Sequence, residues 1–167
     1  MRHRLIALFL TCAAPAAAQV DVVAIGMACP APKLGEVRDA PGTELGQVVI
    51  GTDRTIGIPG TTVPIVPGLS FGFSVALKAD TPLDVTLVTR HPPMGPKRLT
   101  VQSFDWDFVP GETRSHFYMF EYDYEMLPGP WTLAIEAEGA TLASVDFTVT
   151  ETPDPRVDAI CGPAQIS

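Results

Sequence analysis

The stretch at residues 69–78, LSFGFSVALK, is the strongest indication of the fold, because large apolar residues alternate in it with small or polar ones. One side of the alternation carries Leu69, Phe71, Phe73, Val75 and Leu77, and the other carries Ser70, Gly72, Ser74 and Lys78. A two-residue period is typical of a β-strand with one buried face. We therefore expect a strand here, with its aromatic side in the core.

The same alternation recurs on both sides of this stretch. Residues 131–138, WTLAIEAE, place Trp131 and Leu133 on one face, and the turn at 138–140 leads into a second alternating run that ends at Val149. This pattern predicts a β-hairpin with a buried tryptophan. Further strands are expected at residues 21–25, 47–51, 85–90, 99–108 and 114–124.

The chain shows no sustained helical period, and its 17 prolines leave little room for long helices. About seven to eight short strands separated by turns predict an all-β protein, an antiparallel immunoglobulin-like β-sandwich. An up-and-down barrel is the alternative architecture. It is less favoured because Pro59, Pro64 and Pro67 interrupt the early part of the chain.

The first 18 residues resemble a secretory signal peptide. Arg2 and Arg4 precede an apolar run, and three alanines ending at Ala18 precede Gln19. We expect cleavage after Ala18, a β-sandwich domain over 19–150 and a Pro-rich tail over 151–167. The protein is then periplasmic or secreted, with no transmembrane segment. Lipid attachment at Cys12 is the alternative, but Phe9 and Thr11 are not the residues usual before such a cysteine.

The charge of the chain restricts its partners. The formal net charge is −8, and loss of Arg2 and Arg4 with the signal peptide would make it more negative. An acidic chain repels nucleic-acid backbones and anionic lipid surfaces. We therefore expect an unknown protein or envelope component as partner, no nucleic acid and no cofactor.

Two cysteines, Cys29 and Cys161, remain after the expected cleavage. An even pair in an oxidising compartment indicates a disulfide, which would tie the tail to the start of the domain. Thiols for metal or redox chemistry are the alternative reading, but neither cysteine belongs to a CxxC motif.

Four segments resemble one family: DAPGT at 39–43, LSFGF at 69–73, VTLVTRHPPM at 85–94 and FEYDYEMLPGPWTLAIEAEG at 120–139. These are similar to segments of DUF3859, a family of small bacterial exported proteins of unknown function. The resemblance extends from about Asp21 to Val149 and implies a compact β-sandwich in the envelope or outside the cell. It supplies no substrate, cofactor or catalytic residue, and it does not include the two cysteines.

The stretch TRHPPMGPK at 89–97 is a candidate contact loop, because consecutive prolines stiffen it before any partner binds. Its candidate residues are Arg90, His91, Pro92, Pro93, Met94 and Lys97. A plain loop that only resists proteolysis is the alternative. The aromatic strand at 118–124 is expected to share the contact surface.

Metal binding and catalysis receive weaker support. His91 and His116 could meet only if their strands are neighbours, and no spacing in the sequence requires a metal site. Asp105 and Asp107 share a strand face, as the carboxylates of a glycosidase would, but they alternate with aromatic residues as ordinary solvent-facing acids do. We expect no catalytic residues and a non-enzymatic binding or structural module of the cell envelope. The alternative is a small periplasmic metal-binding protein that uses His91 and His116.

Overall fold

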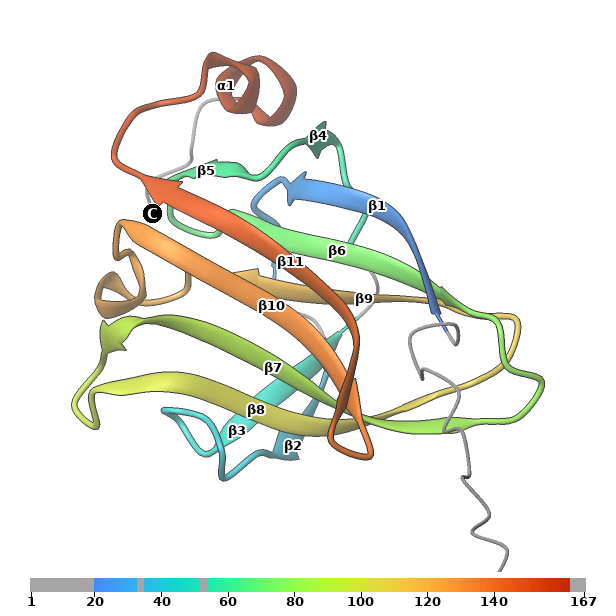
Figure 1. Ribbon diagram of the computed structural model, residues 1–167. Coiled ribbons are helices and arrows are strands. Elements are labelled where there is room, and N and C mark those ends of the chain that lie inside the picture. The colour runs from blue at the N-terminus through green and yellow to red at the C-terminus, as the bar shows by residue number, and fades with distance from the viewer. Residues whose placement is uncertain (1–19, 33–34, 52–53, 163–167) are drawn as a thin grey trace, which may run out of the picture.

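The computed structural model describes residues 20–32, 35–51 and 54–162, and in these residues eleven strands form two packed sheets and a separate hairpin (Figure 1). The predicted signal peptide lies outside the described residues. The first sheet is antiparallel and has the order β4 (Ile58–Pro59), β1 (Val20–Ala28), β6 (Ser70–Leu77) and β9 (Thr113–Met119).

The second sheet has the order β5 (Thr62–Pro64), β11 (Ala140–Thr150), β10 (Gly129–Ala137), β7 (Leu83–Met94) and β8 (Leu99–Phe108). All its pairs are antiparallel except β5 with β11. The antiparallel immunoglobulin-like β-sandwich is confirmed. Three short strands, β4, β5 and β2 (Gly35–Asp39), were not predicted. The hairpin of β2 and β3 (Gln47–Gly51) belongs to neither sheet.

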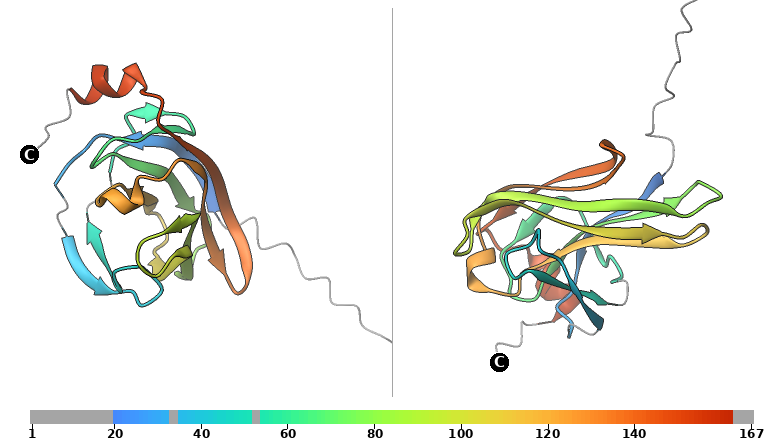
Figure 2. Two further views of the ribbon diagram at one scale, coloured as in Figure 1. Left: turned by 90° about the vertical axis from the view of Figure 1, so that its left-hand side faces the viewer. Right: turned by 90° about the horizontal axis from the view of Figure 1, so that it is seen from below.

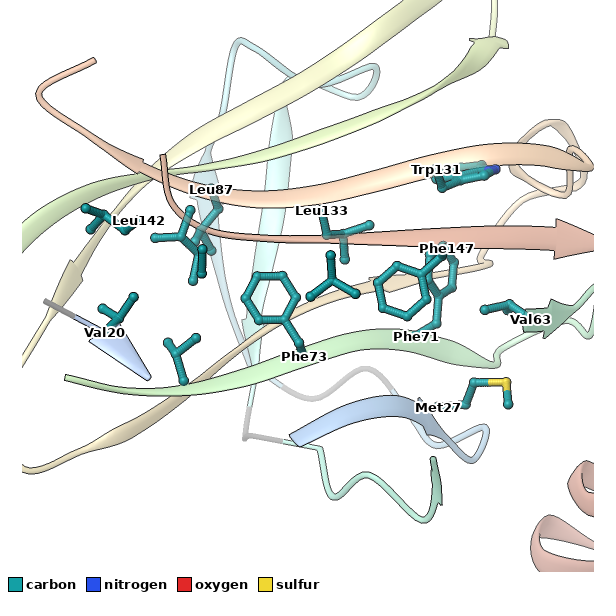
Figure 3. Close-up of a cluster of buried hydrophobic side chains, with 14 of the residues drawn as sticks. Val20, Met27, Val63, Phe71, Phe73, Leu87, Trp131, Leu133, Leu142 and Phe147 are labelled. Carbon is teal, nitrogen blue, oxygen red and sulfur yellow. The ribbon is translucent and has the colours of Figure 1, made fainter. Parts of the chain in front are cut away.

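The core between the sheets contains a cluster of aromatic side chains among many aliphatic ones, and the buried residues of the 69–78 stretch are part of it, as the alternation predicts (Figure 3). The ring of Phe71 lies 5.6 Å from that of Trp131 and 5.2 Å from that of Phe147, and all three side chains are buried. Aromatic pairs at these separations stabilise a core beyond the area that they bury. The predicted inward orientation of Trp131 is therefore confirmed.

Gly72 allows β6 and β9 to approach each other closely. A Cβ atom at this position would lie 2.0 Å from the carbonyl oxygen of His116 on β9. No side chain fits at that distance, which explains a glycine between the two core phenylalanines of LSFGF. The approach fixes His116 and its neighbours on β9 relative to the core.

Two of the predicted boundaries are wrong. Strand β7 continues through His91 and the two prolines to Met94, where a loop was expected. Its pairing with β8 is irregular between Arg90 and Met94, because prolines donate no ladder hydrogen bond. The segment is therefore a distorted strand end.

The other wrong boundary is the end of β9, which stops at Met119 instead of continuing to residue 124. The chain then turns through a 3₁₀ helix, η2 (Asp123–Glu125). Tyr122 and Tyr124 stack on each other with ring centroids 5.3 Å apart, so they do not extend the aromatic face of β9.

The predicted disulfide between Cys29 and Cys161 is confirmed, with the two Cα atoms 5.3 Å apart. It joins the end of β1 to a short helix, α1 (Pro155–Cys161), which the sequence did not predict. Asp154 caps this helix, and Arg156 donates a hydrogen bond to the carbonyl of Pro59 on β4. Among the described residues, no helix has the length and apolar character needed to span a membrane.

Candidate functional site

The β2–β3 hairpin covers one side of the sandwich, and a cavity of about 520 Å³ lies beneath it. Figure 2 (left) shows the hairpin, in cyan, completing the ring of strands seen end on. We call this space the β3–β9 cavity. It is bordered by residues of β3 and β9, by residues of β7 and β8 that form its floor, and by the connections beside them: 28–32, 43–45, 47–51, 54–55, 70, 87, 89, 102, 104, 106, 114–119, 121 and 125.

The hairpin is fastened to the sandwich at its turn. Lys97, in the turn between β7 and β8, donates from its ammonium group to the carbonyls of Glu44 at 2.6 Å and Thr43 at 3.3 Å. In return, a carboxylate oxygen of Glu44 accepts the backbone N–H of Lys97 at 2.9 Å. The backbone N–H of Ser103 donates to the carbonyl of Gly42. These contacts hold the hairpin turn against β8 and the β7–β8 turn.

Gln102 connects this turn to the floor of the cavity. Its side-chain oxygen accepts the backbone N–H of Glu44 at 2.8 Å, and its nitrogen lies 3.4 Å from Nε2 of His91. Gln102 sits opposite Thr89 on the neighbouring strand β7. Neither Gln102 nor Glu44 was predicted as a site residue, because only the folded hairpin brings residue 44 to residue 102.

His91 and Met94 point into the protein. The His91 ring packs 5.0 Å from the Trp131 ring, and its Nδ1 lies 2.8 Å from the carbonyl oxygen of Pro92. Burial lowers the pKa of His91, although the Pro92 carbonyl and the Glu44 carboxylate partly oppose this effect. Met94 is 2% exposed, whereas Arg90, Pro93 and Lys97 are exposed.

The candidate contact loop therefore divides into two sets of side chains. His91 and Met94 are internal, and Lys97 is engaged with the hairpin turn. Arg90 pairs with Glu136 of β10 at 2.9 Å. A contact role for this segment stays a prediction, and only its outer side chains are available for it.

His116 lies in the wall of the cavity and is 2% exposed. Its Nε2 is 3.2 Å from the hydroxyl of Thr89. Burial lowers the pKa of His116 to about 4, partly opposed by the backbone of Ala134, so the ring is neutral near pH 7. A hydroxyl beside an imidazole resembles a nucleophile and its base, but the other nitrogen of this ring, Nδ1, is buried and has no hydrogen-bond partner among the described residues, so no carboxylate orients the ring as a base.

Tyr118, which is partly buried, and Glu125, which is buried, form a polar pair in the lining of the cavity. The Tyr118 hydroxyl donates to Glu125 at 3.0 Å, and the other carboxylate oxygen accepts the backbone N–H groups of Glu121 and Tyr122. Burial raises the pKa of Glu125, while these three hydrogen bonds oppose the shift. Burial also raises the pKa of Tyr118, so this phenol stays protonated.

Trp106 of β8 is part of the floor of the cavity. The guanidinium of Arg38 lies 5.2 Å from its ring centroid and that of Arg114 lies 5.8 Å away. Cations at these distances are attracted to the indole face. Arg38 comes from β2 and Arg114 from β9, so the indole of β8 lies between the hairpin and the first sheet.

Four side chains in the cavity wall carry buried polar atoms without a described hydrogen-bond partner: Ser70 Oγ, Glu44 Oε2, Arg114 Nε and His116 Nδ1. A buried polar group that lacks a partner costs about 1–3 kcal/mol. Such groups are satisfied when water or a ligand occupies the space beside them. The cavity is therefore suited to a molecule that offers both apolar surface and hydrogen bonds.

The described residues contain no cluster of three or more His, Cys, Asp and Glu side chains that could hold a metal ion. His91 and His116 are both buried, but their Nε2 atoms contact Gln102 and Thr89 respectively. Asp105 and Asp107 are exposed, as expected, and Asp105 accepts a hydrogen bond from Thr86.

Comparison with solved structures supports the fold alone. An immunoglobulin-like protein from Pseudomonas aeruginosa is similar over 80% of this chain and 98% of its own, with 22% identity and a TM-score of 0.51. An alkylpurine DNA glycosylase from Pseudomonas fluorescens matches 53% of this chain and 27% of its own, with 11% identity and a TM-score of 0.34. A β-glucosidase from Listeria innocua matches 53% and 14%, with 10% identity and a TM-score of 0.33. The last two likenesses are too low to carry an argument.

No curated protein matches this chain, but a protein family does. A family described as a domain of unknown function, DUF3859, matches residues 17–149, which contain the hairpin and both sheets except for Thr150, the last residue of β11. This chain belongs to the DUF3859 family.

Proposed function

We propose that this chain is a non-enzymatic binding module of the cell envelope, and that it holds its ligand in the β3–β9 cavity. The observation that carries the proposal is the cavity itself. Its volume of about 520 Å³ is in the range of small-molecule and cofactor sites, roughly 300–1,000 Å³. Aromatic walls combined with the unpaired polar atoms of Ser70, Glu44 and Arg114 are features of a site that binds and orients.

The chemistry of the wall favours binding over catalysis. The imidazoles of His91 and His116 have lowered pKa values, and the phenol of Tyr118 has a raised one. All three groups are therefore uncharged near neutral pH. A general acid or base works best when its pKa is near the operating pH. Burial moves the pKa of each of these three groups away from neutral pH. No contact of His91 or His116 among the described residues favours the metal-binding alternative.

Export is part of the proposal. A disulfide between Cys29 and Cys161 persists in an oxidising compartment and is rare in the cytoplasm. The signal-like residues 1–18 would deliver the chain to such a compartment. Cellular fractionation with an antibody against the domain tests this part, and we expect a processed form in the periplasm or the medium.

The hairpin offers a matched pair of variants for testing the site. Val48 is opposite Arg38 in the hairpin, and Arg38 reaches toward Trp106, so these two residues share the face turned toward the cavity. Val37 lies on the other face and is 59% exposed. Val48→Phe should therefore fill the cavity, while Val37→Phe should leave it open.

We would purify the three proteins from the periplasm of a bacterial host and compare them by native mass spectrometry. We expect a bound molecule or partner on the wild-type chain and on Val37→Phe that is lost from Val48→Phe. Circular dichroism would confirm that each variant is folded, and Ile50→Phe serves as a second filling variant. Equal occupancy of all variants, or no occupancy of any, would overturn the assignment of the site.

A further inference from the structure

Two strands that each have one edge unpaired among the described strands, β9 and β3, border the β3–β9 cavity. Strand β9 ends the four-stranded sheet and pairs only with β6 among the described strands, and β3 pairs only with β2. Consecutive residues of both strands, Gln47–Gly51 and 114–119, line the same space. Consecutive lining residues mean that the backbone edges, as well as side chains, border the cavity.

The pairing of β9 with β6 determines which of its backbone groups face the cavity. The N–H of Phe120 donates to the carbonyl of Leu69 on the β6 side. Because backbone groups alternate in direction along a strand, every second residue before Phe120, such as Tyr118 and His116, also directs its N–H and C=O toward β6. The backbone groups of Ser115, Phe117 and Met119 are then directed away from β6. These three residues form a row of donors and acceptors like that of any open sheet edge.

We propose that the cavity takes an extended peptide segment, which pairs with β9 on one side and with β3 on the other. This inference rests on the proposed function and specifies its ligand. The added strand would join β4, β1, β6 and β9 to the β2–β3 hairpin in one continuous sheet. An edge strand recognises an extended peptide through main-chain hydrogen bonds, and the pockets beside it select alternate side chains.

The dimensions fit such a segment. The lining run on β9 contains six residues, 114–119, which extend over roughly 20 Å at about 3.4 Å per residue. A peptide of about six residues spans the same length. A compact small molecule would leave much of this row of backbone groups without a partner.

The walls indicate the side chains that the peptide carries. Every second side chain would face the floor formed by Leu87, Phe104 and Trp106, so apolar residues are required at alternate positions. Glu44 lies beside Gln102, to whose side-chain oxygen its backbone N–H donates, and one oxygen of its carboxylate is buried without a hydrogen-bond partner among the described residues. The unpaired oxygen of Glu44 favours a lysine or arginine of the peptide near Gln102.

The experiment selects heptapeptides from a random phage-displayed library on the disulfide-bonded chain, with binders to Val48→Phe removed. The expected peptides alternate apolar and polar residues and include a cationic side chain. The strongest of them is then synthesised with single N-methyl groups, each of which removes one backbone donor. Methylation at any position inside the bound segment should weaken binding by roughly tenfold or more, because successive donors pair alternately with β9 and with β3, and methylation of a residue flanking the segment should have little effect.

The readout on the protein is amide hydrogen exchange with and without the selected peptide. The exchange rates of the Ser115, Phe117 and Met119 amides should fall by roughly tenfold or more in the complex. The Val37→Phe variant should behave as the wild type does. If no peptide is selected, or if N-methylation inside the bound segment weakens binding no more than methylation of a flanking residue, the peptide inference is overturned. In that case a molecule that co-purifies with wild type and not with Val48→Phe would still support the proposed function.

Discussion

At the scale of single residues, burial of ionisable groups makes the stability of this protein depend on pH. Burial lowers the pKa of His116 from 6.5 to about 4. The unfolded chain therefore binds a proton between these values more readily than the folded chain does. The stability that His116 contributes is complete above pH 6.5 and is lost as the pH falls toward 4.

We expect His116→Gln to flatten this dependence. Between pH 7 and pH 4 the free energy of unfolding of the wild type should fall by about 3 kcal/mol more than that of the variant. Urea unfolding at several pH values measures the difference. Glu125 has a raised pKa and acts in the opposite sense, but it is present in both proteins, so its effect cancels. Parallel pH curves would show that His116 is not buried as described.

A second residue-scale prediction concerns the close approach of β6 and β9. Gly72→Ala places a methyl group against the His116 carbonyl, so the β9 backbone must move. Overpacking of this kind costs about 1–3 kcal/mol, which denaturant unfolding would detect. Gly57→Ala is the control, because its new Cβ meets only the Ile160 side chain at 3.8 Å. Equal stability of the two variants would contradict the close approach.

At the scale of elements, most strands of the sandwich follow from alternation alone. The expected strand at 99–108 coincides with β8, and the expected hairpin after Trp131 is formed by β10 and β11. The strand through His91–Met94 was missed because proline usually ends a strand, whereas here an irregular register accommodates it. The turn after Met119 was missed because the tyrosines at 122 and 124 continue the alternation of β9.

The attachment of the hairpin leads to a prediction at this scale. Lys97→Met removes two hydrogen bonds to the hairpin turn, so the amides of β2 and β3 should exchange faster, while global stability falls by about 1 kcal/mol. Hydrogen exchange followed by mass spectrometry resolves the two effects. Arg98→Met removes the neighbouring exposed cation and should leave the hairpin unchanged. The same acceleration in both variants would argue against a specific role of Lys97.

The disulfide fastens α1 to the end of β1. The bond closes a loop of 132 residues, for which chain entropy predicts a contribution of about 4–5 kcal/mol to stability. Replacing both Cys29 and Cys161 with Ala should therefore lower the denaturation midpoint, and limited proteolysis should then cut near Thr152. A variant as stable and as resistant as the wild type would show that the tail is held by its other contacts.

At the scale of the whole molecule, the sequence predicts the fold better than the site. Alternation at 69–78 and at 131–149 is local, so it identifies the core side chains directly. The β3–β9 cavity depends on contacts between segments far apart, such as Glu44 with Lys97 and Arg38 with Trp106. No local pattern encodes such contacts, and a single sequence therefore gives no sign of an opening between the sheets.

The proposed site depends above all on two strand edges, one of β3 and one of β9, which border the cavity and are unpaired among the described strands. Amide hydrogen exchange on the free, disulfide-bonded protein probes these edges without any ligand. We expect an alternating pattern on β9, in which Ser115, Phe117 and Met119 exchange rapidly while His116 and Tyr118, whose amides face β6, exchange slowly. Slow exchange at all five positions would mean that the outer edge of β9 is already paired, and the cavity would then have no open edge to offer.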